Sequence, residues 1–304
     1  MEFVKDLISI RDLEKKHIDL ILKKSSEMEQ ALKEKKKLSS LGGKVVATLF
    51  FEPSTRTRLS FQSAAMRLGA KVLSFENVGV SSIVKGETFS DTIRMVDGYS
   101  DLIVVRHANE GSARYAAQLA DHPVINGGDG GNQHPTQTLL DMYTIKRAKK
   151  KIEGLNVTLL GDLKHARTMR SLMHGLGMYG ANVTLIAPKG LEMSREVINE
   201  VKDRFGAKVE EKSKMDFSGA DVLYLCRIQK ERFSDQYEAE KVQKEFRITA
   251  DAIKGVKDDL IIMHPLPKVD EVAPEVDQSK YAYYYEQARM GIPVRMAIMD
   301  SMVV

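Results

Sequence analysis

The chain has a single cysteine, Cys226, and no tryptophan among its 304 residues. One cysteine excludes an internal disulfide and any zinc or iron-sulfur site built from several cysteines, a pattern typical of a reducing compartment. Cys226 ends the apolar run ADVLYLC, and free cysteine is among the most buried residue types. We therefore predict that Cys226 packs in the core and is not a nucleophile.

Long apolar segments are also lacking. No run approaches the length that a membrane-spanning helix needs. The N-terminal stretch MEFVKDLISIRDLEKKH carries charges throughout, which is unlike the apolar core of a signal peptide. We expect a cytoplasmic protein that has no membrane partner.

Neither sign of charge is in large excess. Lysine and arginine number 46 against 42 acidic residues, so the formal net charge is 46 − 42 = +4. This balance, without a basic patch interleaved with aromatic residues, argues against a nucleic-acid-binding module, which is one alternative for the chain. We expect no nucleic-acid partner.

Motifs for metals and cofactors are missing as well. The sequence has no HExxH, no Walker A motif and no multi-histidine spacing, so we expect no metal. A GxGxxG pattern occurs at 175–180, but it follows a predicted helix and precedes a predicted strand, the reverse of the order that a dinucleotide needs. We interpret it as a helix end and a turn, and we expect no cofactor.

Apolar runs that are typical of strands alternate with helical patterns, after an amphipathic helix predicted from Arg11 to about Lys35. The predicted strands are Lys44–Phe51, Lys71–Glu76, Asp101–Val105, Val124–Asn126, Asn156–Leu160, Asn182–Ala187, Lys208–Glu210, Asp221–Leu225 and Leu260–Met263. Such alternation predicts an α/β protein with two doubly wound parallel-sheet domains and an active site in the cleft between them. The helix from Pro135 to about Lys151 suggests domains at 1–150 and 151–285, with a last helix from about 286 to 304 that packs back on the first domain.

The stretch FFEPSTRTRLSF, residues 50–61, joins a predicted strand to a predicted helix. Ser54 is suited to the N-cap, and Gly69 follows the last periodic leucine. Free backbone N–H groups, the helix dipole and the guanidinium of Arg56 would together bind an anion such as phosphate. A capped helix with surface arginines is the alternative.

Other polar clusters also follow predicted strands, where ligands bind in open α/β sheets. They include RH at 106–107, GGDGGNQHPTQ at 127–137, DLKHART at 162–168, RIQKERF at 227–233 and PLPKVDE at 265–271. Several arginines suit more than one anionic substrate, and hydroxyl, imidazole and amide groups could polarise a carbonyl. We infer group transfer by positioning and electrostatics, and rank a Ser54 or Thr55 nucleophile below it because no base is visible.

With Ser54-Thr55-Arg56-Thr57-Arg58 and His134-Pro135-Thr136-Gln137, the chain resembles the aspartate and ornithine carbamoyltransferases over nearly all of its length. The resemblance implies a carbamoyl phosphate site that comprises Ser54, Thr55, Arg56, Thr57, Ser81, Lys85, Arg106, His134, Gln137, Pro265 and Leu266. It further implies catalytic roles for Thr55, Arg56, Lys85, Arg106 and His134. In this family the loop with Ser81 and Lys85 reaches the neighbouring subunit's site, so a homotrimer is implied, and a separate regulatory chain is left open.

The acceptor is suggested by the second half of the chain. The motifs HPLP at 264–267 and RIQKER at 227–232 resemble those of the aspartate enzymes rather than the ornithine enzymes. The implied aspartate site comprises Lys85, Arg167, Arg227, Gln229 and Leu266, and Glu52 with Arg232 is implied in domain closure. Cations suit a dicarboxylate and would repel the side chain of ornithine.

The resemblance therefore implies transfer of a carbamoyl group to the α-amine of L-aspartate, which gives N-carbamoyl-L-aspartate and phosphate for pyrimidine synthesis. The amine attacks directly, without a covalent intermediate. Two alternatives stay open: another amino-acid acceptor such as L-ornithine, and a sensor of carbamoyl phosphate without turnover.

Overall fold

The computed structural model describes residues 3–75, 86–229, 233 and 235–303. The chain forms two compact units, the first of residues 1–143 with 290–304 and the second of residues 144–289. The predicted limits, 150 and 285, lie close to these, and each unit is considered on its own below. None of the helices in the described ranges is long and apolar enough to cross a membrane.

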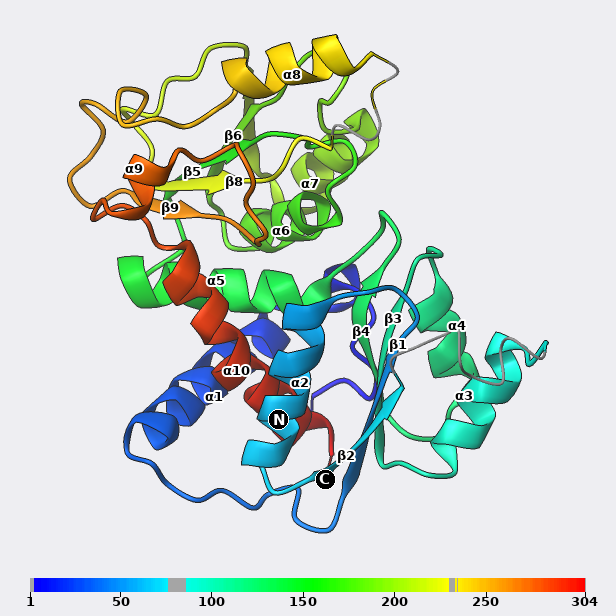
Figure 1. Cartoon of the computed structure of the whole chain (residues 1–304). Coiled ribbons are helices and arrows are strands. Elements are labelled where there is room, and N and C mark those ends of the chain that lie inside the picture. Colours follow the sequence, from blue (N-terminus) through cyan, green and yellow to red (C-terminus); the bar gives the residue numbers. More distant parts are fainter. Residues whose placement is uncertain (1–2, 76–85, 230–232, 234, 304) are drawn as a thin grey trace. The chain divides into compact units, whose positions relative to one another are not determined.

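The first unit is a four-stranded parallel sheet with helices on both faces (Figure 1). Its strands β1 (Val45–Phe50), β2 (Lys71–Phe75), β3 (Leu102–His107) and β4 (Val124–Asp129) lie in the order β2-β1-β3-β4. Figure 1 shows α1 (Lys15–Lys33) and α2 (Thr55–Arg67) on one face, and α3 (Phe89–Asp97) and α4 (Ser112–Leu119) on the other.

Alternate strand positions supply the core under α3 and α4. Ala47 and Leu49 of β1 lie beside Ile103 and Val105 of β3, and all four are at most 1% exposed. Because side chains alternate across a strand, the residues between them face α1 and α2. The strands β1 and β3 are buried on both faces, which explains their nearly continuous apolar sequences, whereas the edge strand β2 is largely exposed.

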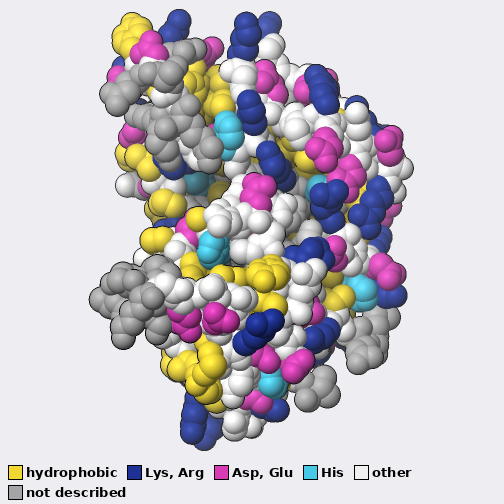
Figure 2. All heavy atoms as spheres, turned by 90° about the vertical axis from the view of Figure 1, so that its right-hand side faces the viewer, with side chains coloured by type: hydrophobic (Ala, Val, Ile, Leu, Met, Phe, Trp, Pro, Cys, Tyr) yellow, Lys and Arg dark blue, Asp and Glu magenta, His cyan; other side chains and the backbone are white. Residues whose placement is uncertain are grey.

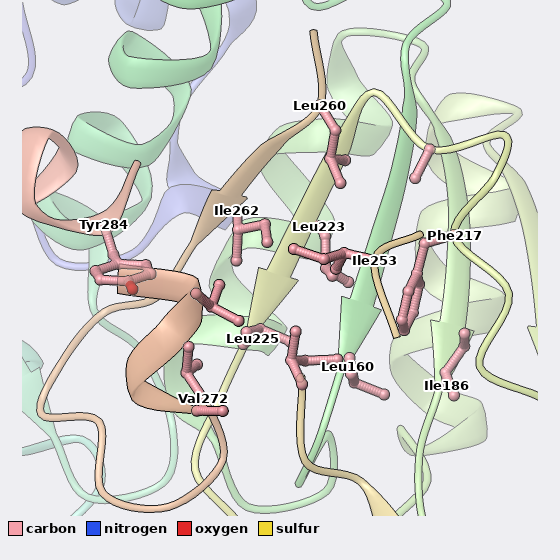
Figure 3. Close-up of a cluster of buried hydrophobic side chains, with 14 residues drawn as sticks. Leu160, Ile186, Phe217, Leu223, Leu225, Ile253, Leu260, Ile262, Val272 and Tyr284 are labelled. Atoms are coloured by element: carbon pink, nitrogen blue, oxygen red, sulfur yellow. The ribbon is translucent and has the colours of Figure 1, made fainter. Parts of the chain in front are cut away.

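The second unit is a five-stranded parallel sheet with the strand order β7-β6-β5-β8-β9. The strands are β5 (Asn156–Leu160), β6 (Asn182–Ile186), β7 (Lys208–Lys212), β8 (Val222–Leu225) and β9 (Ile261–Met263). The helices are α6 (Arg167–Met178), α7 (Arg195–Phe205), α8 (Gln236–Glu245) and α9 (Pro274–Asp277). Figure 3 shows the core on one face, where Leu223, Leu225 and Ile262 from the strands pack with Phe217 and Tyr284.

The chain passes from one unit to the other within two helices. They are α5 (Pro135–Lys149) and α10 (Tyr284–Met302). The final helix predicted from about 286 begins two positions earlier, and its residues from Met290 on belong to the first unit.

The nine predicted strands are present and all of them pair in parallel, as expected. The largest difference is in β4, whose predicted end is Asn126 but which continues to Asp129. The GxGxxG pattern lies at the end of α6 and in the turn after it, where Gly180 has φ +65°, so the predicted helix end is confirmed.

The prediction of one continuous N-terminal helix from Arg11 is wrong. A 3₁₀ turn, η1 (Ile10–Asp12), is followed by Leu13 in an extended conformation, and α1 begins only at Lys15. The break arises because Glu14 and His17 form a reciprocal capping pair, with the Glu14 N–H donating to His17 Nδ1 at 3.2 Å.

Candidate functional site

The predicted anion loop lies at the N-terminus of α2, directly after β1. Ser54 is the N-cap, with φ −160° and ψ 92°, and in the described structure its hydroxyl makes no capping hydrogen bond to the helix. Thr55 and Arg56 are exposed in the first turn, whereas Thr57 is buried. Backbone N–H groups of a first helical turn lack partners within the helix and favour an anion. The hydroxyls and the guanidinium of this turn therefore suit phosphate oxygens.

Arg106 brings a second guanidinium to the same edge of the sheet, because β3 pairs with β1 and Arg106 lies opposite Phe50. It is 7% exposed. Its Nη1 donates to the Gly127 carbonyl oxygen at 3.1 Å, and its Nη2 donates to Glu52 Oε1 at 2.9 Å. Glu52 and Gly127 thereby hold the guanidinium in one orientation. Although Arg56 is exposed, neighbouring protein atoms partly desolvate its guanidinium and lower its pKa.

His107, next to Arg106 in the sequence, serves packing instead. Its ring lies 5.2 Å from that of Phe51 and 5.4 Å from that of Phe89, measured between ring centroids. Burial lowers the pKa of His107, against the opposing effect of the Glu52 carboxylate. Its Nδ1 accepts the Asn109 N–H at 2.9 Å. His107 is thus a neutral part of an aromatic cluster.

The loop that carries His134 is organised by Asp129, a residue that the sequence did not single out. Its fully buried carboxylate accepts hydrogen bonds from the backbone N–H groups of Gly111 and Gln133 at 2.9 and 3.1 Å. It also accepts from the side-chain amides of Asn126 and Asn132 at 2.8 and 3.0 Å. This network shapes the turn just before His134, which is 4% exposed and directly precedes α5.

Gln137 lies in the first turn of α5 and is 9% exposed. Its Nε2 donates to Oδ1 of Asp141 at 2.9 Å, one helical turn further on. Asp141 is another residue that the sequence analysis missed. The spacing of four residues between a glutamine and an aspartate on a helix is the signal that could have found it.

In the second unit, two predicted anion-binding residues follow neighbouring strands. Arg167 is the first residue of α6, after β5, and Arg227 follows β8. β5 and β8 pair, so their carboxyl ends are adjacent. Both side chains are partly buried. Gln229 lies two residues beyond Arg227 and is also partly buried.

The loops after β5 and β8 approach each other closely. Gly161 has φ +122°, and a Cβ atom there would lie 2.3 Å from the Cys226 carbonyl oxygen. The Cys226 thiol donates to the Asp162 carbonyl oxygen at 3.3 Å, and burial raises its pKa, so the predicted core position is confirmed. The Asp162 carboxylate accepts the His165 N–H at 3.0 Å, which fixes the turn into α6.

The HPLP turn follows β9 and is held by a buried pair. His264 Nδ1 accepts the Leu266 N–H at 2.8 Å, and Nε2 lies 2.8 Å from Oε1 of Glu271. Because Nδ1 is an acceptor, Nε2 carries the proton and faces the carboxylate. Burial alone would raise the pKa of Glu271, but the adjacent imidazole of His264 and the hydrogen bond from the Val269 N–H hold it below its usual value. Leu266, at φ +55°, and Pro265 are both partly buried.

The structure thus places each described residue of the predicted site after a parallel strand, at the carboxyl edge of one of the two sheets. Glu52, Ser54, Thr55, Arg56, Thr57, Arg106, His134 and Gln137 belong to the first unit, and Arg167, Arg227, Gln229, Pro265 and Leu266 to the second. The predicted residues Ser81, Lys85 and Arg232 lie outside the described residues.

The surface in Figure 2 mixes charges of both signs. Lysine and arginine side chains are interspersed with aspartate and glutamate side chains over this face. The interspersed pattern agrees with the small formal net charge and contrasts with the basic stripe of a nucleic-acid-binding surface.

Comparison with known proteins agrees with this division of the site. Residues 5–147 match the model for "Aspartate/ornithine carbamoyltransferase, carbamoyl-P binding domain". Residues 153–302 match "Aspartate/ornithine carbamoyltransferase, Asp/Orn binding domain". The aspartate carbamoyltransferase catalytic subunit of Thermococcus gammatolerans is 51% identical over 299 residues, which are 97% of this chain and 96% of the relative.

Solved structures are similar over nearly the whole chain. The catalytic subunit of M. jannaschii aspartate transcarbamoylase is 45% identical with a TM-score of 0.93, covering 99% of this chain and 98% of that one. Aspartate transcarbamoylase from Trypanosoma cruzi, solved in complex with carbamoyl phosphate and aspartate, is 34% identical with a TM-score of 0.93, covering 99% and 96%. Two matched family domains, a shared fold and this level of identity show that the chain belongs to the aspartate/ornithine carbamoyltransferase family.

Proposed function

We propose that this chain transfers the carbamoyl group of carbamoyl phosphate to the α-amine of L-aspartate. The products are N-carbamoyl-L-aspartate and phosphate, in an early step of pyrimidine synthesis, and we place this reaction in the cytoplasm. The observation that carries the proposal is the helix N-terminus at Ser54–Thr57, which shares a sheet edge with Arg106, in a chain 51% identical to an aspartate carbamoyltransferase.

The proposed donor site binds the two ends of carbamoyl phosphate differently. Ser54, Thr55, Arg56 and Thr57 hold the phosphate, with Ser81 and Lys85 contributing from a neighbouring subunit. Thr55, Arg106 and His134 donate hydrogen bonds to the carbamoyl oxygen, and Gln137 binds the carbamoyl amide. Pro265 and Leu266 contribute from the HPLP turn.

The proposed acceptor site is cationic. Arg167, Arg227 and Lys85 offset the two carboxylates of aspartate, while Gln229 and Leu266 fix its orientation. Arginine forks suit carboxylates because two parallel N–H groups can bind both oxygens. The same cations would repel the side chain of ornithine.

In the proposed mechanism, the neutral amine of aspartate attacks the carbamoyl carbon. A carbon–nitrogen bond forms and negative charge develops on the carbamoyl oxygen. The bond to the phosphate oxygen then breaks, and the departing phosphate accepts the proton that the amine nitrogen loses. Thr55, Arg106 and His134 stabilise the developing charge, and Arg56 with Lys85 stabilises the departing phosphate. Donors that are already oriented, as Arg106 is by the Gly127 carbonyl oxygen, stabilise a transition state with little reorganisation.

We further propose a homotrimer with shared active sites. The name "catalytic subunit" of the archaeal relatives supports a separate regulatory chain as a partner of that trimer. Glu52 and Arg232 are proposed to stabilise the closed form, with Glu52 exchanging its partner Arg106 for other arginines on closure.

The test is phosphate release from carbamoyl phosphate by the purified chain with L-aspartate, with L-ornithine or without an acceptor. The product is identified by its mass. We expect release only with aspartate, together with carbamoyl-aspartate. Release with ornithine alone would overturn the acceptor assignment, and tight binding of carbamoyl phosphate without turnover would indicate a sensor.

A further inference from the structure

The first unit contains a buried cation that the proposed mechanism does not use. Arg295 of α10 is 3% exposed, and its guanidinium carbon lies 4.8 Å from the ring centroid of Phe61 on α2. Its Nη1 donates to the Gly291 carbonyl oxygen at 3.2 Å. A Cβ atom at Gly291 would lie 2.4 Å from this same Nη1, so glycine makes room for the guanidinium.

Asp141, a carboxylate on α5, interacts electrostatically with Arg295. Burial lowers the pKa of Arg295 to about 10, Asp141 raises it and the positive charge of Arg106 lowers it. Arg295 therefore remains charged at neutral pH. Asp141 is fully buried, and a buried carboxylate is costly unless a cation and hydrogen bonds compensate it.

Asp141 in turn determines how Gln137 is oriented. Gln137 donates its amide N–H to Oδ1 of Asp141 over 2.9 Å, and a carboxylate in its ionised form can only accept hydrogen bonds. The amide oxygen of Gln137 then faces away from Asp141. A protonated or amide side chain at position 141 could donate as well as accept, and it would permit either orientation of Gln137.

We propose that Asp141 is a positioning residue that makes Gln137 an acceptor toward the substrate and thereby selects an amino group on the acyl carbon. The inference rests on the proposed function and deepens it. A carbamoyl group offers N–H to the oxygen of Gln137, whereas an acetyl group offers a methyl and leaves that oxygen unpaired. Sites built to hydrogen-bond a polar group reject analogues that lack it.

The experiment compares carbamoyl phosphate with acetyl phosphate, which differs in this one group. Equilibrium dissociation constants for both are measured for the full chain and for Asp141→Asn, Gln137→Ala and the double variant. We expect Asp141→Asn to reduce the preference for carbamoyl phosphate about tenfold, because Gln137 loses its fixed orientation. In the Gln137→Ala background the same change should alter the preference by less than about twofold, because the residue that it positions is gone.

Two further variants separate positioning from a general loss of structure. Asp101→Asn removes a carboxylate that accepts from the Val45 N–H and from Lys44 in the same unit, and it should leave the preference unchanged. Asp141→Asn with Arg295→Met removes both buried charges together, which protects the fold if Asp141→Asn alone destabilises it. Asp141→Asn with Arg295→Met should show the same reduced preference for carbamoyl phosphate as Asp141→Asn alone.

The outcomes distinguish the two proposals. A wild-type chain that does not bind carbamoyl phosphate overturns the proposed function, and this inference with it. A wild-type chain that binds and transfers, with Asp141 variants that keep the full preference for carbamoyl phosphate, overturns the positioning role alone. The positioning role is also overturned if Asp141→Asn reduces the preference for carbamoyl phosphate equally in the wild-type and Gln137→Ala backgrounds.

Discussion

Glu52 and Arg106 form an ion pair at the edge of the first sheet, with 2.9 Å between Oε1 and Nη2. The proposed substrate oxygen needs the same guanidinium, so Glu52 competes with carbamoyl phosphate for Arg106. Removing the carboxylate should therefore help binding of the first substrate. It should also harm turnover, because Glu52 is proposed to stabilise the closed form.

The first prediction is that Glu52→Gln lowers the dissociation constant for carbamoyl phosphate alone about threefold, as expected for a partly exposed ion pair. The turnover number and the affinity for aspartate should both fall. Calorimetric titration and steady-state kinetics measure the two effects, and Glu153→Gln, an exposed site in the second unit, is the control. Weaker binding of carbamoyl phosphate would show that Glu52 orients Arg106 more than it competes for it.

The buried pair of His264 and Glu271 leads to a prediction about acid stability. The pKa of Glu271 is held below its usual value, so the carboxylate binds fewer protons in the folded than in the unfolded state. Its stabilisation is complete above the unfolded pKa of about 4.3 and is lost as the pH falls through the lower folded pKa.

The second prediction follows from this lowered pKa of Glu271. Glu271→Gln should cost about 1–3 kcal/mol of unfolding free energy at neutral pH, the cost of a weakened buried hydrogen bond. The difference between wild type and variant should shrink as the pH falls below about 4.3. Denaturant unfolding at several pH values measures it, with Glu275→Gln on the exposed face of α9 as the matched control. A difference that stays constant with pH would contradict the assigned shift.

Among the elements, the carboxyl ends of β5 and β8 approach each other closely. Gly161 combines a φ of +122° with a site for a Cβ only 2.3 Å from the Cys226 carbonyl oxygen. Gly190, after β6, has φ +86°, and a Cβ atom there would meet no other atom within 4 Å, so it isolates the backbone effect.

The third prediction compares alanine at these two glycines. Gly190→Ala should cost about 1 kcal/mol from backbone strain, and Gly161→Ala about 3 kcal/mol or more, because it adds a clash that separates the strand ends. Gly161→Ala should also raise the KM for aspartate, since Arg167 and Arg227 follow these strands. Thermal unfolding and kinetics test both, and equal costs at the two sites would refute the role of the close approach.

The strands and the loops that follow them could be predicted from sequence because continuous apolar runs such as VTLL and LYLC are typical of buried parallel strands. Arg56 and His134 could also be predicted, because charged and polar side chains directly after such a strand indicate a ligand-binding loop. Asp129 and Arg295 could not, and the spacing that would have indicated Asp141 does not show that it is buried. Their roles depend on burial and on partners brought near by the fold, and Arg295 contacts Phe61 from the far end of the chain.

For the whole molecule, the proposal of shared sites can be tested without knowing how the subunits dock. In a closed ring each site would take Arg56 from one subunit and Lys85 from the next, so neither Arg56→Ala nor Lys85→Ala trimers are active.

The fourth prediction is that dissociating, mixing and reassembling the two inactive variants in equal amounts restores activity at about a quarter of the sites, the fraction that pairs two intact residues at random. Each variant mixed with itself is the control. Proven hybrid trimers without activity would place Lys85 and Arg56 in the same subunit's site or remove Lys85 from the mechanism, and activity well above a quarter would require that one variant retains function by itself.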